Sequence, residues 1–202
     1  RPNDAMKESL IAKDLDPYSP LAQMNYGRAL YYSRRFDDAE AYFKTLLARS
    51  PDVPQFLNIM GLVQLQKRNY GGAITTLEKL HAQNPQMAAA ALGYAYGKAG
   101  RYADATMIIN ELNEIAKDRP VPPQEKAIIY MAMGEIDKAF QQLEASYSER
   151  FASLAYLTTD PLYEDLQDDP RYADLARRMQ LPTTPYLATV SSRQPDLDHR
   201  GN

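Results

Sequence analysis

The sequence predicts an all-α fold, a right-handed α-solenoid of stacked helix-turn-helix units, on the basis of two observations. First, a glycine followed nine residues later by an aromatic residue, and three residues after that by alanine, recurs along the chain. The sets are Gly27, Phe36 and Ala39; Gly61, Tyr70 and Ala73; and Gly93, Tyr102 and Ala105. Second, the glycines are 34 residues apart (27 to 61) and then 32 apart (61 to 93), a period typical of repeat proteins.

Each unit is predicted to contain two helices separated by a short turn. The turns carry charged residues or glycine, which favour a break between helices: Arg34-Arg35, Lys67-Arg68-Asn69, Gly100-Arg101 and Gly134. The predicted helix pairs are 20–33 with 36–49, 54–67 with 70–83, 86–99 with 102–117, and 123–133 with 136–149. The sequence therefore predicts four repeat units within residues 20–149.

Residues 1–17 are predicted to be the second helix of a truncated upstream repeat. Ala5 lies 34 residues before Ala39, so the period extends backward to the start of the chain. A helix over about 3–15 should end at Asp16-Pro17, because the residue before proline disfavours helical backbone. Leu10 and Ile11 are expected to pack. We expect the chain to be part of a longer protein.

The period is lost after the fourth unit. Residues 150–181 contain Asp160-Pro161 and Asp169-Pro170, and each pair is expected to end one helix and begin another, so this segment is predicted to form capping helices. Residues 182–202 are rich in proline and polar residues and are predicted to form an extended tail. Its first residues, 182–190, are expected to pack on a repeat surface of the same or a neighbouring molecule, giving a homo-oligomer in the second case. The alternative is that the tail lies on the capping helices.

The units resemble the tetratricopeptide repeat (TPR), in which small residues lie where two helices cross and large apolar residues surround them. In the middle unit, Gly61 and Ala73 occupy the small positions, and Leu57, Met60, Leu77 and Pro85 occupy other family positions. The final part of the chain resembles the C-terminal repeat domain of bacterial multidomain regulators. In those proteins the repeats follow a winged-helix DNA-binding domain or a serine/threonine kinase domain. The resemblance implies a sensory or interaction module.

Composition excludes several kinds of site and partner. The net charge is −3, with 23 basic and 26 acidic residues interspersed, so this segment is not expected to bind nucleic acid directly. No apolar run is long enough for a membrane helix, and the absence of cysteine excludes disulfides and thiolate metal sites. The compartment stays unknown, with the cytoplasm favoured, or the periplasm if a membrane segment precedes the chain.

No catalytic residue, cofactor or metal site is predicted. The two histidines, His81 and His199, have no evident partner in the sequence. An acidic cluster near the C-terminus lacks the glycine turn and ligand spacing of a calcium loop. Its members are expected instead to stabilise helix N-termini and to pair with Arg171, Arg177 or Arg178. The cluster comprises Asp160, Glu164, Asp165, Asp168 and Asp169.

A peptide-binding groove is predicted on the concave face, at first-helix positions that internal packing does not require. These positions mix aromatic, aliphatic and amide side chains with one cation, as peptide grooves do. They are Met24, Asn25, Arg28, Tyr31, Asn58, Leu62, Leu65, Ala90, Tyr94, Gln124 and Ile128. The alternative for Leu62, Leu65 and Ile128 is that they pack between neighbouring units.

The predicted function is therefore that of a protein–protein interaction module that binds a protein or peptide ligand. The second resemblance places it as the sensory or interaction domain of a bacterial transcriptional regulator or kinase. One alternative is a free-standing TPR scaffold or assembly factor without an effector domain. Another is an enzyme that uses the concave groove.

Overall fold

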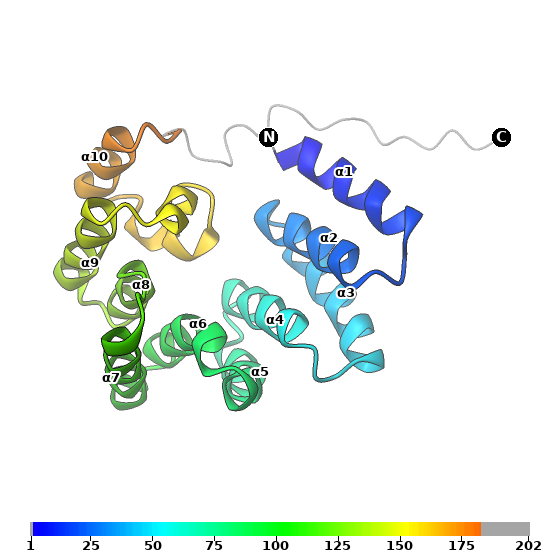
Figure 1. The fold of residues 1–202 in the computed structure, drawn as a ribbon, viewed down its shortest axis with the longest axis horizontal. Helices are drawn as coiled ribbons and strands as arrows, with labels where there is room; N and C mark the ends of the chain where they lie inside the picture. Colours follow the sequence, from blue (N-terminus) through cyan, green and yellow to red (C-terminus); the bar gives the residue numbers. More distant parts are fainter. Residues whose placement is uncertain (1, 183–202) are drawn as a thin grey trace.

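The computed structural model describes residues 2–182 of the chain, and all regular secondary structure in this range is helical. Paired helices form a curved array with an inner and an outer layer (Figure 1). The inner layer consists of α2 (Pro20–Tyr32), α4 (Pro54–Gln66), α6 (Pro85–Lys98) and α8 (Gln124–Ala132). The outer layer consists of α3 (Phe36–Arg49), α5 (Tyr70–Gln83), α7 (Tyr102–Asp118) and α9 (Ile136–Ser148). The predicted all-α solenoid is confirmed.

Additional elements lie at both ends of this array. At the N-terminal end, α1 (Pro2–Leu15) packs on α2. After α9 come two short 3₁₀ helices, η1 (Ala152–Tyr156) and η2 (Pro161–Leu166), and then α10 (Pro170–Arg178). No helix within residues 2–182 is long and apolar enough to cross a membrane.

The helix starts follow directly from the sequence. Three inner helices begin with proline, which lacks the N–H group that would be unpaired in the first turn. Ser19 accepts a hydrogen bond from the Ala22 N–H at the start of α2, and Asn84 accepts one from the Met87 N–H at the start of α6. Proline and polar caps therefore define where the inner helices begin.

The turn between the two helices of each unit contains one residue in left-handed backbone conformation. This residue is Arg34 (φ 61°) in the first unit and Arg68 (φ 58°) in the second. Glycine occupies the equivalent positions, at Gly100 (φ 74°) and Gly134 (φ 81°). Glycine adopts this conformation without a steric penalty, whereas a residue with a Cβ atom loses about 1 kcal/mol. The first two turns therefore retain an arginine at a backbone position that favours glycine.

Glycine also lies where the two helices of a unit approach most closely. A Cβ atom added to Gly27 would lie 2.2 Å from Cζ of Phe43, and one added to Gly61 would lie 2.5 Å from Cδ2 of Leu77. Phe43 and Leu77 are fully buried, so neither side chain has space to move away. The predicted crossing positions are confirmed for these two units.

The apolar core consists of two clusters that follow the array. The first cluster joins α2, α3 and α4 and includes Leu30, Tyr31 and Phe43. The second runs from α4 to α10 and includes Leu154 of η1 and Leu162, Tyr163 and Leu166 of η2. Leu47 and Leu62 pack against both clusters, which makes the interior continuous along the array.

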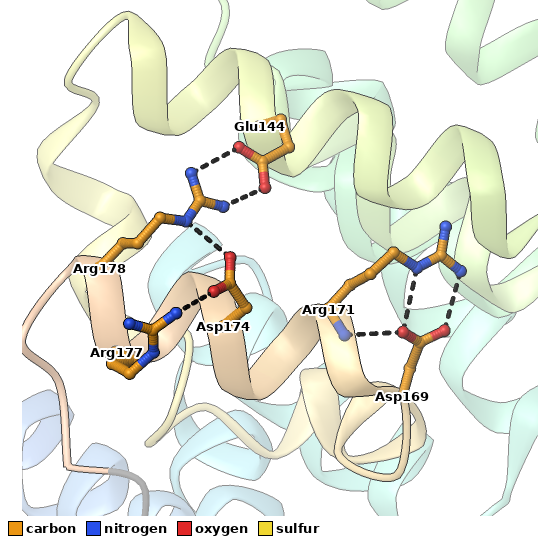
Figure 2. Close-up of polar contacts among 6 residues, drawn as sticks. All are labelled: Glu144, Asp169, Arg171, Asp174, Arg177 and Arg178. Carbon is orange, nitrogen blue, oxygen red and sulfur yellow. Dashed lines mark hydrogen bonds and ion pairs between the residues drawn. The ribbon is translucent and has the colours of Figure 1, made fainter.

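Helix α10 packs beside α9 and is fixed there by ion pairs (Figure 2). Arg178 binds both carboxylate oxygens of Glu144 on α9, and Arg171 binds Asp137 at the start of α9, 2.8 Å away. Asp169 accepts a hydrogen bond from the Arg171 N–H and also binds its guanidinium group, as predicted. The other two arginines differ from the prediction, because Arg177 and Arg178 pair with Asp174 on their own helix.

One local expectation is corrected. Leu10 and Ile11 of α1 were expected to pack, but they are 38% and 44% exposed, because α2 covers only one side of α1.

An ion pair links the first two units at the surface. The Nζ of Lys67, in the turn of the second unit, binds Asp37 (2.6 Å) and Glu40 (2.5 Å) of α3.

Replacing Gly61 with leucine should destabilise the fold, because the new side chain would overlap Leu77. We expect a loss of about 1–3 kcal/mol in the free energy of unfolding, measured by urea denaturation. Gly71→Ala is the matched control. A Cβ atom at Gly71 meets nothing within 4 Å, and alanine is favoured in helix interiors, so this change should stabilise the chain by about 0.5–1 kcal/mol. Equal midpoints for Gly61→Leu and the parent chain would contradict the crossing.

Candidate functional site

The chain that follows α9 turns back into the hollow of the solenoid. We call residues 151–169, which include η1 and η2, the return segment. In Figure 1 this segment, drawn in yellow and gold, lies inside the ring between α8 and α2. Its η1 contacts α9 and its η2 contacts α8, and it reaches α2 at the opposite end of the array. The concave face of the solenoid is therefore already occupied by the chain itself.

Two side chains at the end of α2 hold the return segment. The Tyr31 hydroxyl donates a hydrogen bond to Oδ1 of Asp160 (3.1 Å). The Arg34 guanidinium pairs with Oε1 of Glu164 (2.8 Å) and donates to the carbonyl oxygen of Thr159 (3.2 Å). We call these contacts the polar seam, because they join the first unit to the return segment.

The electrostatics of the polar seam reflect its burial. Burial raises the pKa of Tyr31 well above its usual value, and the nearby negative charge of Asp160 raises it further. Burial also raises the pKa of Asp160, although hydrogen bonds from the Leu162 N–H and the Tyr31 hydroxyl oppose this shift. The Asp160 charge is thus less well stabilised here than it would be in water.

Rings from both sides meet beside the polar seam. Tyr32 of α2 stacks on Tyr156 of η1, with ring centroids 6.2 Å apart and an interplanar angle of 22°. The Arg28 guanidinium, one turn earlier on α2, lies 5.9 Å from the centroid of the Tyr32 ring. Tyr156 remains 50% exposed, so this aromatic contact is open to solvent.

Helices α6 and α8 hold the return segment at two further points, one near each of its ends. Lys98 of α6 forms an ion pair with Asp165, and its ammonium group lies 5.5 Å from the centroid of the Tyr94 ring. Gln124 of α8 donates a hydrogen bond to the Ser153 hydroxyl and accepts one from the Ser146 hydroxyl of α9. Ser146 stands where other units have leucine, and this buried hydrogen bond provides a structural reason for the departure.

Two cavities remain on the concave side. The larger has a volume of about 470 Å³ and lies between α1, α2 and η1, lined by residues that include Asn25, Arg28, Tyr32 and Tyr156. The smaller has a volume of about 310 Å³ and lies between α4, α6 and η2, lined by residues that include Arg68, Tyr70, Tyr94 and Glu164. Both are open spaces beside the return segment, so a ligand can reach these parts of the concave face without displacing it.

The predicted groove residues fall into two groups. Asn25 is exposed, and Asn25 and Arg28 line the larger cavity, whereas Met24 and Asn58 are partly buried. The expectation that Tyr31, Tyr94 and Gln124 form an open surface is corrected, because all three are buried. Tyr31 binds Asp160 of the return segment, Gln124 binds Ser153, and Tyr94 lines the smaller cavity with Pro161.

Three further residues of the predicted set are largely involved in packing. Ile128 is buried in the core, and Leu62 and Ala90 are partly buried against it. This agrees with the packing alternative for Leu62 and Ile128, and Leu65, which is also buried in this core, agrees with it as well. The 183–202 part of the predicted tail lies outside the described residues.

The sequence pattern missed Arg34, Lys98 and Ser153. Arg34 lies in a turn rather than on a first helix, and Lys98 occupies the last position of α6, so neither belongs to the repeat positions from which a groove is predicted. One signal for Arg34 was present in the sequence, since glycine occupies the matching turn positions Gly100 and Gly134. An arginine at such a position indicates a role for its side chain.

Glu125 in the first turn of α8 has an unusual environment. Its Oε2 is buried and has no hydrogen-bond partner among the residues that the structure describes. Burial raises the pKa of this carboxyl group to about 7, an effect that the positive charge of Arg119 partly opposes. The negative charge of Glu125 in turn contributes to the raised pKa of buried Tyr163 in η2. Within residues 2–182, no three His, Cys, Asp or Glu side chains gather in an arrangement suited to a metal ion.

Comparison with known proteins agrees with this architecture. Residues 24–88 match the family model described as "Tetratricopeptide repeat". The fold is similar to the crystal structure of a thermophilic TPR protein in Thermus thermophilus, with a TM-score of 0.61 and 21% sequence identity over 88% of this chain and 91% of that one. No curated protein matches the sequence. The predicted resemblance to the tetratricopeptide repeat is therefore confirmed, and a TPR fold supports a role in protein–protein interaction.

We expect Glu125→Gln to change how stability depends on pH. The folded-state pKa of Glu125, about 7, exceeds the value of about 4.3 expected in the unfolded chain, so the folded state binds the extra proton between these values. Its contribution to stability is complete below about pH 4.3 and is lost as the pH rises through 7. Because the group is partly solvated, we expect the free energy of unfolding to fall by about 2 kcal/mol over this range, which is less than the full pKa shift would give.

Glutamine keeps the shape of the protonated acid, so Glu125→Gln should be more stable than the parent chain at about pH 8 and similar to it at about pH 4.5. Thermal unfolding followed by circular dichroism across this range measures the difference. Glu149→Gln, at an exposed position, is the matched control and should follow the parent curve. Parallel curves for the parent and Glu125→Gln would contradict the assignment.

Proposed function

We propose that this chain is a protein–protein interaction module whose concave face binds a peptide segment of a partner protein. The observation that carries the proposal is the return segment itself. The concave face holds this irregular, proline-containing stretch of polypeptide through side chains of α2, α6 and α8. A surface that binds such a segment within its own chain has the shape and the polar groups needed to bind one from another protein.

The larger cavity is the accessible part of this face. Asn25 and Arg28 supply polar groups, and Tyr32 and Tyr156 supply aromatic surface, which together resemble the composition of peptide-binding sites. We therefore propose Asn25 and Arg28 as ligand-contacting residues in the resting chain. The other predicted groove residues, including Met24, Asn58 and Tyr94, are proposed to act only where a ligand extends further along the concave face.

The proposed setting is the sensory or interaction domain of a bacterial transcriptional regulator or kinase. It rests on the resemblance of the segment from Ala127 to Leu181 to the C-terminal part of such proteins. A free-standing scaffold or assembly factor is the alternative. The complete reading frame that encodes this chain distinguishes these two settings. A regulator or kinase requires a winged-helix or kinase domain in that reading frame, whereas a free-standing scaffold lacks one. No catalytic step is assigned to the chain.

The peptide-binding proposal predicts that ligands selected from a displayed peptide library depend on inner-face residues. Arg28→Ala and Tyr156→Ala should each weaken binding of the selected peptides about tenfold, because they remove a charge and an aromatic ring from the accessible cavity. Isothermal titration calorimetry measures the affinities. Lys117→Ala, on the exposed surface of α7, is the control and should leave them unchanged. Ligands that respond to Lys117→Ala but not to the two inner-face changes would place the site elsewhere.

Duplex DNA should not bind to this chain. The acidic and basic side chains are interspersed and the net charge is −3, so the chain offers no strongly basic field to displace counterions from a phosphate backbone. A titration with labelled duplex DNA at about 50 mM salt is the test. Salt-sensitive binding in the micromolar range would contradict this expectation.

A further inference from the structure

We propose that the polar seam between α2 and the return segment is a gate, and that the ligand of the opened gate is an acidic peptide segment of a partner protein. This inference rests on the proposed function and deepens it by naming the chemistry of the partner. In the closed state described here, the chain's own Asp160 and Glu164 occupy the positions that the partner's carboxylates would take. Opening would separate α2 from the return segment and expose Tyr31 and Arg34.

The two sides of the seam belong to different parts of the apolar core. Leu154, Leu157 and Leu166 of the return segment are fully buried in the core cluster that runs from α4 to α10. Tyr31 belongs to the other cluster, formed by α2, α3 and α4. The contacts that the structure shows between α2 and the return segment involve a hydroxyl, a guanidinium and one pair of stacked rings. Separating these surfaces exposes the buried Tyr31 at the edge of its cluster and leaves Leu154, Leu157 and Leu166 within theirs.

Closure of the seam has a modest net stability. The Glu164 side chain is 43% exposed, and an ion pair at such an exposed position adds little to stability. Asp160 is held at an electrostatic cost, as its raised pKa shows, and this partly offsets its two hydrogen bonds. Cavities lie beside the return segment near both α2 and α6, so packing around the buried Tyr31 does not extend to these places. A ligand with matching groups can therefore compete with the internal contacts.

Charge complementarity indicates the kind of ligand. The concave side presents the cations Arg28, Arg34 and Lys98, and two of them already bind carboxylates of the return segment. The return segment offers Asp160, Glu164 and Asp165 around the apolar residues Leu162 and Tyr163, and thus shows which pattern this surface accepts. An acidic segment with proline and an aromatic residue satisfies the same partners.

The turn at Arg34 supports a function for this side chain. Its backbone conformation favours glycine, which occupies the equivalent turns of the third and fourth units at Gly100 and Gly134, whereas the second unit has Arg68. An arginine here is unfavourable for the backbone, and it forms the ion pair with Glu164. Replacement by glycine should therefore remove the charge while leaving the turn intact.

The binding test uses a labelled synthetic peptide, TTDPLYEDLQ, which copies residues 158–167. The receptor is the full chain carrying Asp160→Asn and Glu164→Gln, which weakens the internal contacts while asparagine still caps η2. This receptor should bind the peptide at least about tenfold more tightly than the parent chain, because the internal carboxylates compete at an effective concentration on the order of millimolar. Adding Arg34→Gly should reverse the gain, whereas Arg150→Gly, an exposed arginine with φ 61°, should not.

Gate opening is measured separately by energy transfer between two dyes. The chain has no cysteine, so Ala48→Cys on α3 and Ser148→Cys on α9, both exposed positions, allow selective labelling. Transfer efficiency should fall in the Asp160→Asn, Glu164→Gln chain and on adding the acidic peptide to the parent chain. A neutral peptide, TTNPLYQNLQ, with amides at all three acidic positions, should leave it unchanged.

The outcomes separate this inference from the proposed function. Unchanged energy transfer in the Asp160→Asn, Glu164→Gln chain would overturn the gate. Equal binding of the acidic and neutral peptides would overturn the partner chemistry even if the gate opens. Either result can occur together with binding of library peptides to the inner face. In that case the peptide-binding function stands, and only the gate or the acidic character of the ligand is excluded.

Discussion

The close crossing of two helices in the first and second units, at Gly27 and Gly61, is the constraint on which the rest of the structure depends. A side chain at Gly27 or Gly61 would overlap Phe43 or Leu77, so only glycine lets the inner and outer helices approach to this distance. This approach produces two layers with the inner helices on the concave side. The curvature of the array then brings the ends of the array toward each other, and the return segment lies between α2 and α8, bonding to the first and contacting the second (Figure 1).

The repeat units could be predicted from the sequence because they depend on neighbours in the chain. Helix crossings, caps and turns involve residues at fixed spacing, and the structure places most helices within a residue or two of the predicted bounds. The contents of the concave face could not be predicted in the same way. Tyr31 binds Asp160, 129 residues later, and no periodic pattern relates the two positions. The return segment has no repeat of its own, so only its two Asp-Pro helix starts were recognisable.

Departures from the repeat pattern were the most informative positions. Ser146 replaces a leucine, and its hydroxyl joins the buried hydrogen bonds of Gln124, so the substitution belongs to the site that holds η1. Arg34 replaces a turn glycine and binds the return segment. Each was visible as an irregularity in the sequence, but the partner on the other side of the contact required the structure. Polar side chains at positions that the repeat reserves for small or apolar residues are therefore sensible places to look for function in such arrays.

Closing the ring also changes the way in which the array unfolds. In an open solenoid each unit touches only the next, so the free energy is a sum of local terms and the terminal units unravel independently. Here the contacts from Tyr31 and Arg34 to the return segment couple the first unit to the last. Loss of structure in the first unit therefore removes a stabilising contact from the return segment, and unfolding of the return segment removes one from the first unit. The molecule gains cooperativity between its most distant parts from a few polar side chains.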